Sequence, residues 1–115
     1  MKTNELSGTA LDWAVASCEG IELENGHYNR LLVDGRMSKG QSMLVMYLPS
    51  TDWAQGGPII EREQIAIFLN GDDEWTAEDG WYRASGPTPL IAAMRCYVAS
   101  KLGDEVEIPE ELTTC

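Results

Sequence analysis

The feature that most constrains the fold is one strongly marked helix, in the stretch GPTPLIAAMRCYVASKLGDE. Thr88 is a suitable N-cap, Pro89 fits the first helical position, and Gly103 can end the helix. Its apolar residues form two adjoining stripes: Leu90, Ala93, Met94, Tyr97 and Val98, flanked by Ile91, Ala92, Cys96 and Ala99. We therefore expect more than half of its circumference to be buried.

The rest of the chain predicts one more helix and several strands. Residues 7–20 carry apolar side chains at helical spacing and end in Gly20. Strands are expected at 25–33, 42–48, 59–69 and 81–85, with a hairpin loop at 34–41 and an acidic surface loop at 70–80. This order favours an α+β fold, an antiparallel sheet of about four to five strands with the N- and C-terminal helices packed on one face. We expect a single domain over residues 1–115, with an acidic tail on the surface from about 104 to 115.

The charge balance argues against direct binding to nucleic acid. Asp and Glu total 19 against 8 Lys and Arg, which gives a net charge of −11. A nucleic-acid surface needs clustered cations, and here the sign is reversed. The charge either serves solubility or forms an acidic surface that meets a basic protein partner or imitates DNA.

The cysteines and the N-terminus favour a reducing compartment. Cys18, Cys96 and Cys115 are too few and too widely spaced for a disulfide framework or a zinc site. We expect the first two to be buried thiols and Cys115 to be exposed. The sequence shows neither a signal peptide nor a run long enough to span a membrane, so we expect the host bacterial cytoplasm and no membrane contact.

Recognised catalytic and metal-binding patterns are missing from the sequence. His27 is the single histidine and lies in a turn, and the acidic run of 72–79 lacks the ligand order of a calcium loop. No nucleophile elbow, phosphate loop or dinucleotide fingerprint is present. We expect no enzyme activity, no metal and no cofactor, with carboxylate-based catalysis left open as an alternative.

One candidate binding segment is STDWAQGGPIIERE, residues 50–63, which we interpret as a loop leading into a strand. Trp53 offers a surface on which a nucleobase can stack, while Gln55, Asp52 and Thr51 can read polar edges. Gly56 and Gly57 permit positive φ and let the backbone approach a flat ligand. The alternative is that Trp53 closes the end of the core and the glycines only turn the chain.

The second candidate is the start of the last helix, where free amide groups and a partial positive charge can hold an anion. Gly86 and Thr88 lie there, and Arg95 is the one charge inside the helix. We expect Arg95 to meet either an anionic ligand or a carboxylate such as Glu61 or Glu63. The alternative is that Thr88 serves only as a cap.

Three stretches carry a resemblance to a known family: ELSGTALDWAVA, STDWAQGGPIIERE and TPLIAAMRCYVASKLGDEVEIPEEL. They resemble the NinX family of small proteins from lambdoid bacteriophages and their prophages. The resemblance covers about half of the chain and implies a phage-encoded accessory protein in a bacterial cytoplasm. The family supplies no assigned biochemical role and no catalytic residues.

These observations favour a non-enzymatic protein that binds a small molecule. Our leading hypothesis is sequestration of a nucleotide-derived signal of bacterial anti-phage defence, at a site shared between the subunits of a homo-oligomer. It requires that Trp53 and the start of the last helix open onto one hollow. The alternative is an acidic interaction protein that antagonises a host protein, or assists phage DNA metabolism through a protein partner.

Overall fold

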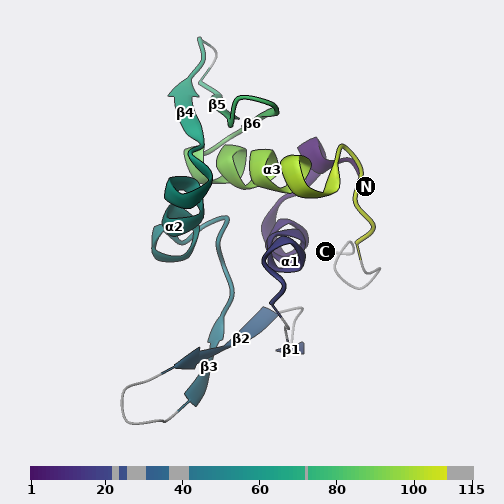
Figure 1. Ribbon diagram of the computed structural model, residues 1–115, viewed down its shortest axis with the longest axis vertical. Helices are drawn as coiled ribbons and strands as arrows, with labels where there is room; N and C mark the ends of the chain where they lie inside the picture. The colour runs from purple at the N-terminus through teal and green to yellow at the C-terminus, as the bar shows by residue number, and fades with distance from the viewer. Residues whose placement is uncertain (22–23, 26–30, 37–41, 72, 109–115) are drawn as a thin grey trace.

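The computed structural model describes residues 1–21, 24–25, 31–36, 42–71 and 73–108, and the fold is α+β (Figure 1). A 3-10 turn, η1 (Thr3–Glu5), precedes the helices α1 (Gly8–Glu19), α2 (Trp53–Glu63) and α3 (Pro89–Leu102). The strands are β1 (Glu24–Asn25), β2 (Leu31–Arg36), β3 (Ser42–Met46), β4 (Ala66–Leu69), β5 (Trp75–Glu78) and β6 (Arg83–Gly86). They form two three-stranded antiparallel sheets, β1-β2-β3 and β4-β5-β6, in place of the single sheet of four to five strands that the sequence predicts.

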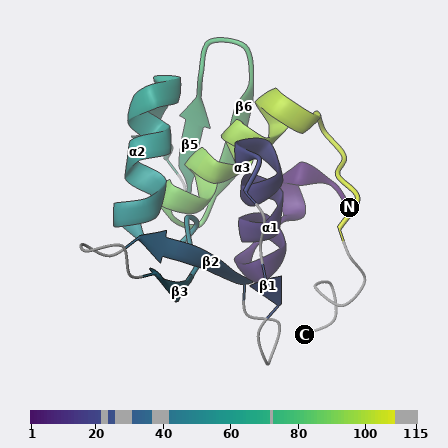
Figure 2. The same ribbon diagram turned by 60° about the horizontal axis from the view of Figure 1, so that its bottom comes forward.

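Helix α3 lies at the centre of the molecule, as its two apolar stripes predict. It packs against the β4–β6 sheet, α1 and α2 (Figure 1; Figure 2 shows the same arrangement from another side). The Thr88 hydroxyl oxygen accepts from the Ile91 amide at 3.1 Å, and Gly103 ends the helix with a φ of 88°. These caps confirm the predicted bounds.

Residues 53–63 of the segment 50–63 form the helix α2, and only residues 50–52 lie in a turn before it, so the interpretation of the segment as a loop leading into a strand is wrong from Trp53 onward. Asp52 caps α2 by accepting from the Ala54 amide at 3.0 Å, and Gln64 ends it in the left-handed conformation. Neither Gly56 nor Gly57 has a positive φ. Tertiary packing here overrides the weak helix propensity of two glycines and a proline.

Gly56 has a packing role. A Cβ at this position would lie 2.4 Å from the Pro49 carbonyl oxygen and 2.6 Å from Leu90 Cδ1. Only glycine lets α2 approach both α3 and the turn at 48–51 this closely.

The β4–β6 sheet corrects two further predictions. The expected strand at 59–69 is reduced to β4, and the expected strand at 81–85 is displaced to β6. The acidic segment 70–80, predicted as a surface loop, contains the middle strand β5, in which Thr76 and Ala77 are buried. Its charges lie at the ends of a short apolar strand and mask the strand signal.

The β2–β3 hairpin and the tail each agree with the sequence in part, because β2 continues through residues 34–36, which were predicted as the start of the hairpin loop. Antiparallel pairing joins Leu32 to Met46 and Arg36 to Ser42, while the connecting residues 37–41 lie outside the described residues. In the tail, Val106 is buried and exchanges two backbone hydrogen bonds of 2.9 Å with Met1. The tail is therefore tied to the N-terminus at that point. Residues 109–115, with Cys115, lie outside the described part.

Candidate ligand-binding site

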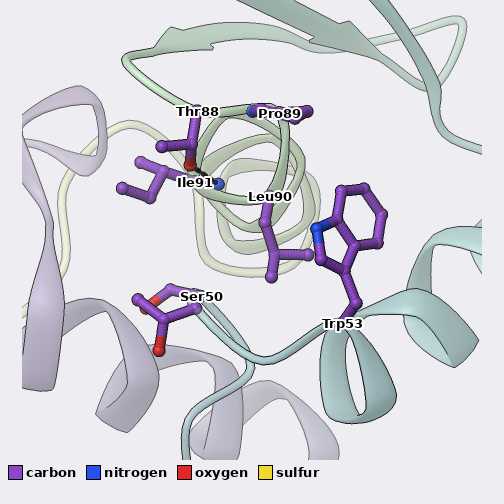
Figure 3. Close-up of a pocket in the computed structure, with 7 residues that line it drawn as sticks. Ser50, Trp53, Thr88, Pro89, Leu90 and Ile91 are labelled. Atoms are coloured by element: carbon purple, nitrogen blue, oxygen red, sulfur yellow. Dashed lines mark hydrogen bonds between the residues drawn. The ribbon is translucent and has the colours of Figure 1, made fainter.

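Trp53 and the start of α3 line one hollow of about 210 Å³. Its lining residues come from the 50–53 segment and the first turn of α3: Ser50, Thr51, Trp53, Thr88, Pro89, Leu90 and Ile91. Figure 3 looks along α3 and shows the Leu90 side chain pointing between Trp53 and Ser50. The fold thus brings together two segments that are 35 or more residues apart in the sequence.

The Trp53 indole is available to a ligand. Its side chain begins α2 and is 54% exposed, so it does not close the core. The indole stands beside the first turn of α3, next to Pro89 and Leu90 (Figure 3). An aromatic face with an apolar neighbour and an open side can stack a planar ring.

Of the three polar side chains predicted to read a ligand, Thr51 lines the hollow, whereas Gln55 and Asp52 instead brace the loop before α2. Gln55 Oε1 accepts from the Leu48 amide at 2.9 Å, and its Nε2 donates to the Met46 carbonyl at 2.9 Å and to Asp52 Oδ2 at 3.1 Å. Neither Gln55 nor Asp52 lines the hollow. Their hydrogen bonds fix the segment from which Trp53 projects.

Arg95 and Gly86 also lie outside the hollow. The Arg95 guanidinium donates to the carbonyl oxygens of Leu6 and Ser85, both at 2.8 Å, and burial lowers its pKa. The prediction that Arg95 pairs with Glu61 or Glu63 is wrong, because its guanidinium donates to these two backbone carbonyls instead. Gly86 permits close packing, since a Cβ there would lie 3.0 Å from the Ala92 amide nitrogen.

The first turn of α3 offers less to an anion than its sequence suggests. The Ile91 amide is already bonded to Thr88, and Pro89 has no N–H. What remains to attract an anion is the Leu90 amide and the partial positive charge of the helix end. Within the described part of the chain, no Lys or Arg is among the lining residues. The hollow therefore suits a flat ring better than a phosphate group.

A buried carboxyl that sequence reasoning missed holds the rim of the hollow. Asp12 of α1 is 2% exposed, and its Oδ1 accepts from the Ser50 amide at 2.8 Å. Burial raises the pKa of Asp12 to about 6, and hydrogen bonding to Ser50 opposes the rise. The available signal was helical spacing, because Asp12 precedes Val15 by three residues and Ala16 by four, on the buried side of α1.

Other kinds of site find little support among the described residues. The described residues contain no group of three or more His, Cys, Asp or Glu side chains placed to hold a metal ion. Burial raises the pKa of the Cys18 thiol to about 11 and that of Cys96 to about 12, which keeps both protonated and unreactive. Across the described ranges, each helix is too short or too polar to cross a membrane.

Comparison with protein families gives a match over most of the chain. The family model described as Bacteriophage P22, NinX covers residues 2–101. A search of the curated proteins finds no match.

Proposed function

The chain belongs to the NinX family of phage proteins, and from this premise we propose that it is a non-enzymatic protein that binds a small molecule in the Trp53 hollow. The observation that carries the proposal is that the exposed Trp53 indole and the start of α3 line the same hollow. The molecule is a nucleotide-derived signal of bacterial anti-phage defence, which the protein sequesters in the host cytoplasm.

The contacts of such a ligand follow from the lining residues. Its ring stacks on Trp53, which contributes ~1–3 kcal/mol for a base on an aromatic side chain. Leu90 and Pro89 supply an apolar wall. Because the Thr88 oxygen already accepts a hydrogen bond, its hydroxyl proton is free to donate to a polar group of the ligand.

The size of the hollow supports a shared site. Its volume of about 210 Å³ is below the range of ~300–1,000 Å³ for pockets that enclose drug-sized ligands. One chain therefore holds the ring and leaves the sugar and phosphate outside. A second copy of the chain in a homo-oligomer would cover them.

The proposal is tested by thermal melting with a panel of nucleotides and cyclic nucleotides. A ligand present at about 100 times its dissociation constant adds ~2.7 kcal/mol of stability, a shift of several degrees. We expect Trp53→Ala to remove this shift. Trp81→Ala, which deletes an indole that is 90% exposed in the β5–β6 turn, is the matched control and keeps it. The proposal would be overturned if no nucleotide in the panel raised the melting temperature, or if Trp53→Ala and Trp81→Ala reduced the shift equally.

A second candidate is an acidic interaction protein that antagonises a host protein, or assists phage DNA metabolism through a partner. The observation that favours it is the set of exposed large apolar side chains on and beside the β4–β6 sheet: Phe68, Leu69, Trp81 and Tyr82. Trp and Tyr are enriched among residues that dominate protein interfaces. This candidate predicts salt-sensitive capture of a basic host protein that Trp81→Ala weakens and Trp53→Ala does not.

A further inference from the structure

The Ser50 hydroxyl is the one buried side-chain oxygen among the described residues that has no hydrogen-bond partner. Ser50 is 1% exposed and lines the Trp53 hollow. Native proteins leave few buried polar groups unbonded, because each such group lowers the stability of the fold. An unbonded hydroxyl in the wall of a hollow therefore indicates a partner that the described chain does not supply.

The backbone holds Ser50 firmly in this wall. The Asp12 carboxyl oxygen Oδ1 accepts from the Ser50 amide at 2.8 Å. The Leu48 carbonyl oxygen closes the turn by accepting from the amides of Thr51 and Asp52, at 3.1 and 2.8 Å. The Ser50 side chain helps to lower the pKa of Asp12, so it lies near this carboxyl, but the two side chains do not meet in hydrogen-bond geometry.

The hydroxyl can turn towards a ligand without losing a bond. A serine oxygen moves between three staggered positions by rotation about the Cα–Cβ bond. Because the Ser50 oxygen makes no hydrogen bond among the described residues, this rotation breaks none of them. A hydroxyl both donates and accepts, so it can bond to either an amino or a carbonyl group.

Ser50 and Trp53 lie on opposite sides of the Leu90 side chain in the same hollow. Figure 3 shows the Trp53 indole on one side and Ser50 on the other, below Ile91. The Leu90 and Ile91 side chains carry no polar group. A ring that stacks on Trp53 and fills the hollow therefore meets Ser50 as the buried polar group along its edge.

We propose that the Ser50 hydroxyl selects rings that carry an amino or a carbonyl group on the edge that faces it. This inference rests on the proposed function, because it concerns the edge of a ring that stacks on Trp53. The ring group supplies the missing partner, in a place from which water is largely excluded. A ring without such a group leaves the hydroxyl unbonded and binds more weakly.

The test compares adenosine with purine riboside, which has a hydrogen atom in place of the amino group on the ring. Titration calorimetry measures both affinities. We expect the native protein to bind adenosine about fivefold more tightly, the effect of one hydrogen bond. In Ser50→Ala the ratio of the two affinities should fall to about one, because the alanine can bond to neither nucleoside. Thr51→Val is the matched control: it removes an exposed hydroxyl from the same hollow and should keep the ratio.

Two further measurements separate this inference from the proposed function. Trp53→Ala should weaken both nucleosides by a similar factor, because the stacking surface is common to them. Ser50→Ala should melt at or above the temperature of the native protein, because it deletes an unbonded hydroxyl and keeps the amide that Asp12 holds.

The inference alone fails if Trp53→Ala weakens both nucleosides while the affinity ratio is the same in the native protein and in Ser50→Ala. It also fails if Thr51→Val lowers the ratio as much as Ser50→Ala does. A melting temperature of Ser50→Ala clearly below that of the native protein would mean that the hydroxyl has a partner in the chain. If neither nucleoside binds the native protein, the Trp53 hollow holds no such ring, and the inference and the proposed function fail together.

Discussion

At the scale of single residues, Asp12 shows how one buried carboxyl connects the core to the candidate site. It holds the Ser50 amide, and Ser50 begins the segment that leads to Trp53. Neither partner carries a motif, and their pairing across 38 positions arises only in the folded chain. The buried charge makes the stability of the protein depend on pH.

The predicted dependence on pH follows from the direction of the shift. The pKa of Asp12 is about 6 in the folded protein against an ordinary 3.8, so the folded state binds the proton more tightly. Its contribution to stability is full below pH ~4 and is lost as the pH rises through ~6. A shift of about two units corresponds to roughly 3 kcal/mol.

Asp12→Asn tests this directly, because the amide oxygen can still accept from Ser50 but carries no charge. We expect the two proteins to have similar free energies of unfolding near pH 4, and the variant to be more stable by up to roughly 3 kcal/mol at pH 8. Urea unfolding across this range measures the difference. Asp104→Asn, at an exposed position, is the control: it measures the effect of losing one negative charge without a change in the core. Parallel pH profiles for the native and Asp12→Asn proteins would contradict the assignment.

At the scale of elements, α2 depends on its neighbours more than on its own sequence. Gly56 packs against Pro49 and Leu90, whereas a Cβ on Gly57 would lie 3.9 Å from Trp53 Cε3, an ordinary van der Waals distance. We expect Gly56→Ala to destabilise the protein by about 1–3 kcal/mol through overpacking. Gly57→Ala should be neutral, or stabilise by up to ~1 kcal/mol through helix propensity.

Urea unfolding of both variants decides this prediction, and tryptophan fluorescence adds a second measurement. Gly56→Ala should also change the surroundings of Trp53, since α2 must move away from α3. If Gly56→Ala were as stable as Gly57→Ala, the close approach of the two helices would be wrong.

The two helices α2 and α3 also show what sequence can predict. The bounds of α3 were predictable because Thr88, Pro89 and Gly103 are local signals that agree with its apolar stripes. The helix α2 was not, because two glycines and a proline signal a break, and its stability comes from tertiary contacts. Strand β5 was not predicted either, because the acidic residues around it are typical of a surface loop.

The candidate site, too, could be predicted from the sequence only in part. The ligand-binding hypothesis required that Trp53 and the start of the last helix open onto one hollow. Trp53 and Thr88 do line the same hollow. The roles of Gln55 and Arg95 could not be predicted, because their partners are backbone groups of Met46, Leu48, Leu6 and Ser85 that only the fold brings near. Residue type indicates what a side chain can bond, whereas the fold decides which partner it meets.

At the scale of the whole molecule, the net charge of −11 separates the two candidate functions. A nucleotide must approach an acidic protein, and among the described residues no Lys or Arg lines the Trp53 hollow to offset the repulsion. Salt screens that repulsion, since the Debye length falls from about 30 Å at 0.01 M to about 3 Å at 1 M. Nucleotide affinity should therefore rise with ionic strength, whereas capture of a basic protein should weaken.

Titration calorimetry of one nucleotide and of its uncharged nucleoside across this salt range measures the effect. The ring contact is the same for both, so the nucleoside should bind with little dependence on salt and the nucleotide should gain affinity towards that of the nucleoside. Trp53→Ala should weaken both to a similar degree, because the stacking surface is common to them. If the nucleotide instead binds more tightly at low salt, cations must contact its phosphate. The site would then lie away from the Trp53 hollow, because the described residues that line this hollow include no Lys or Arg.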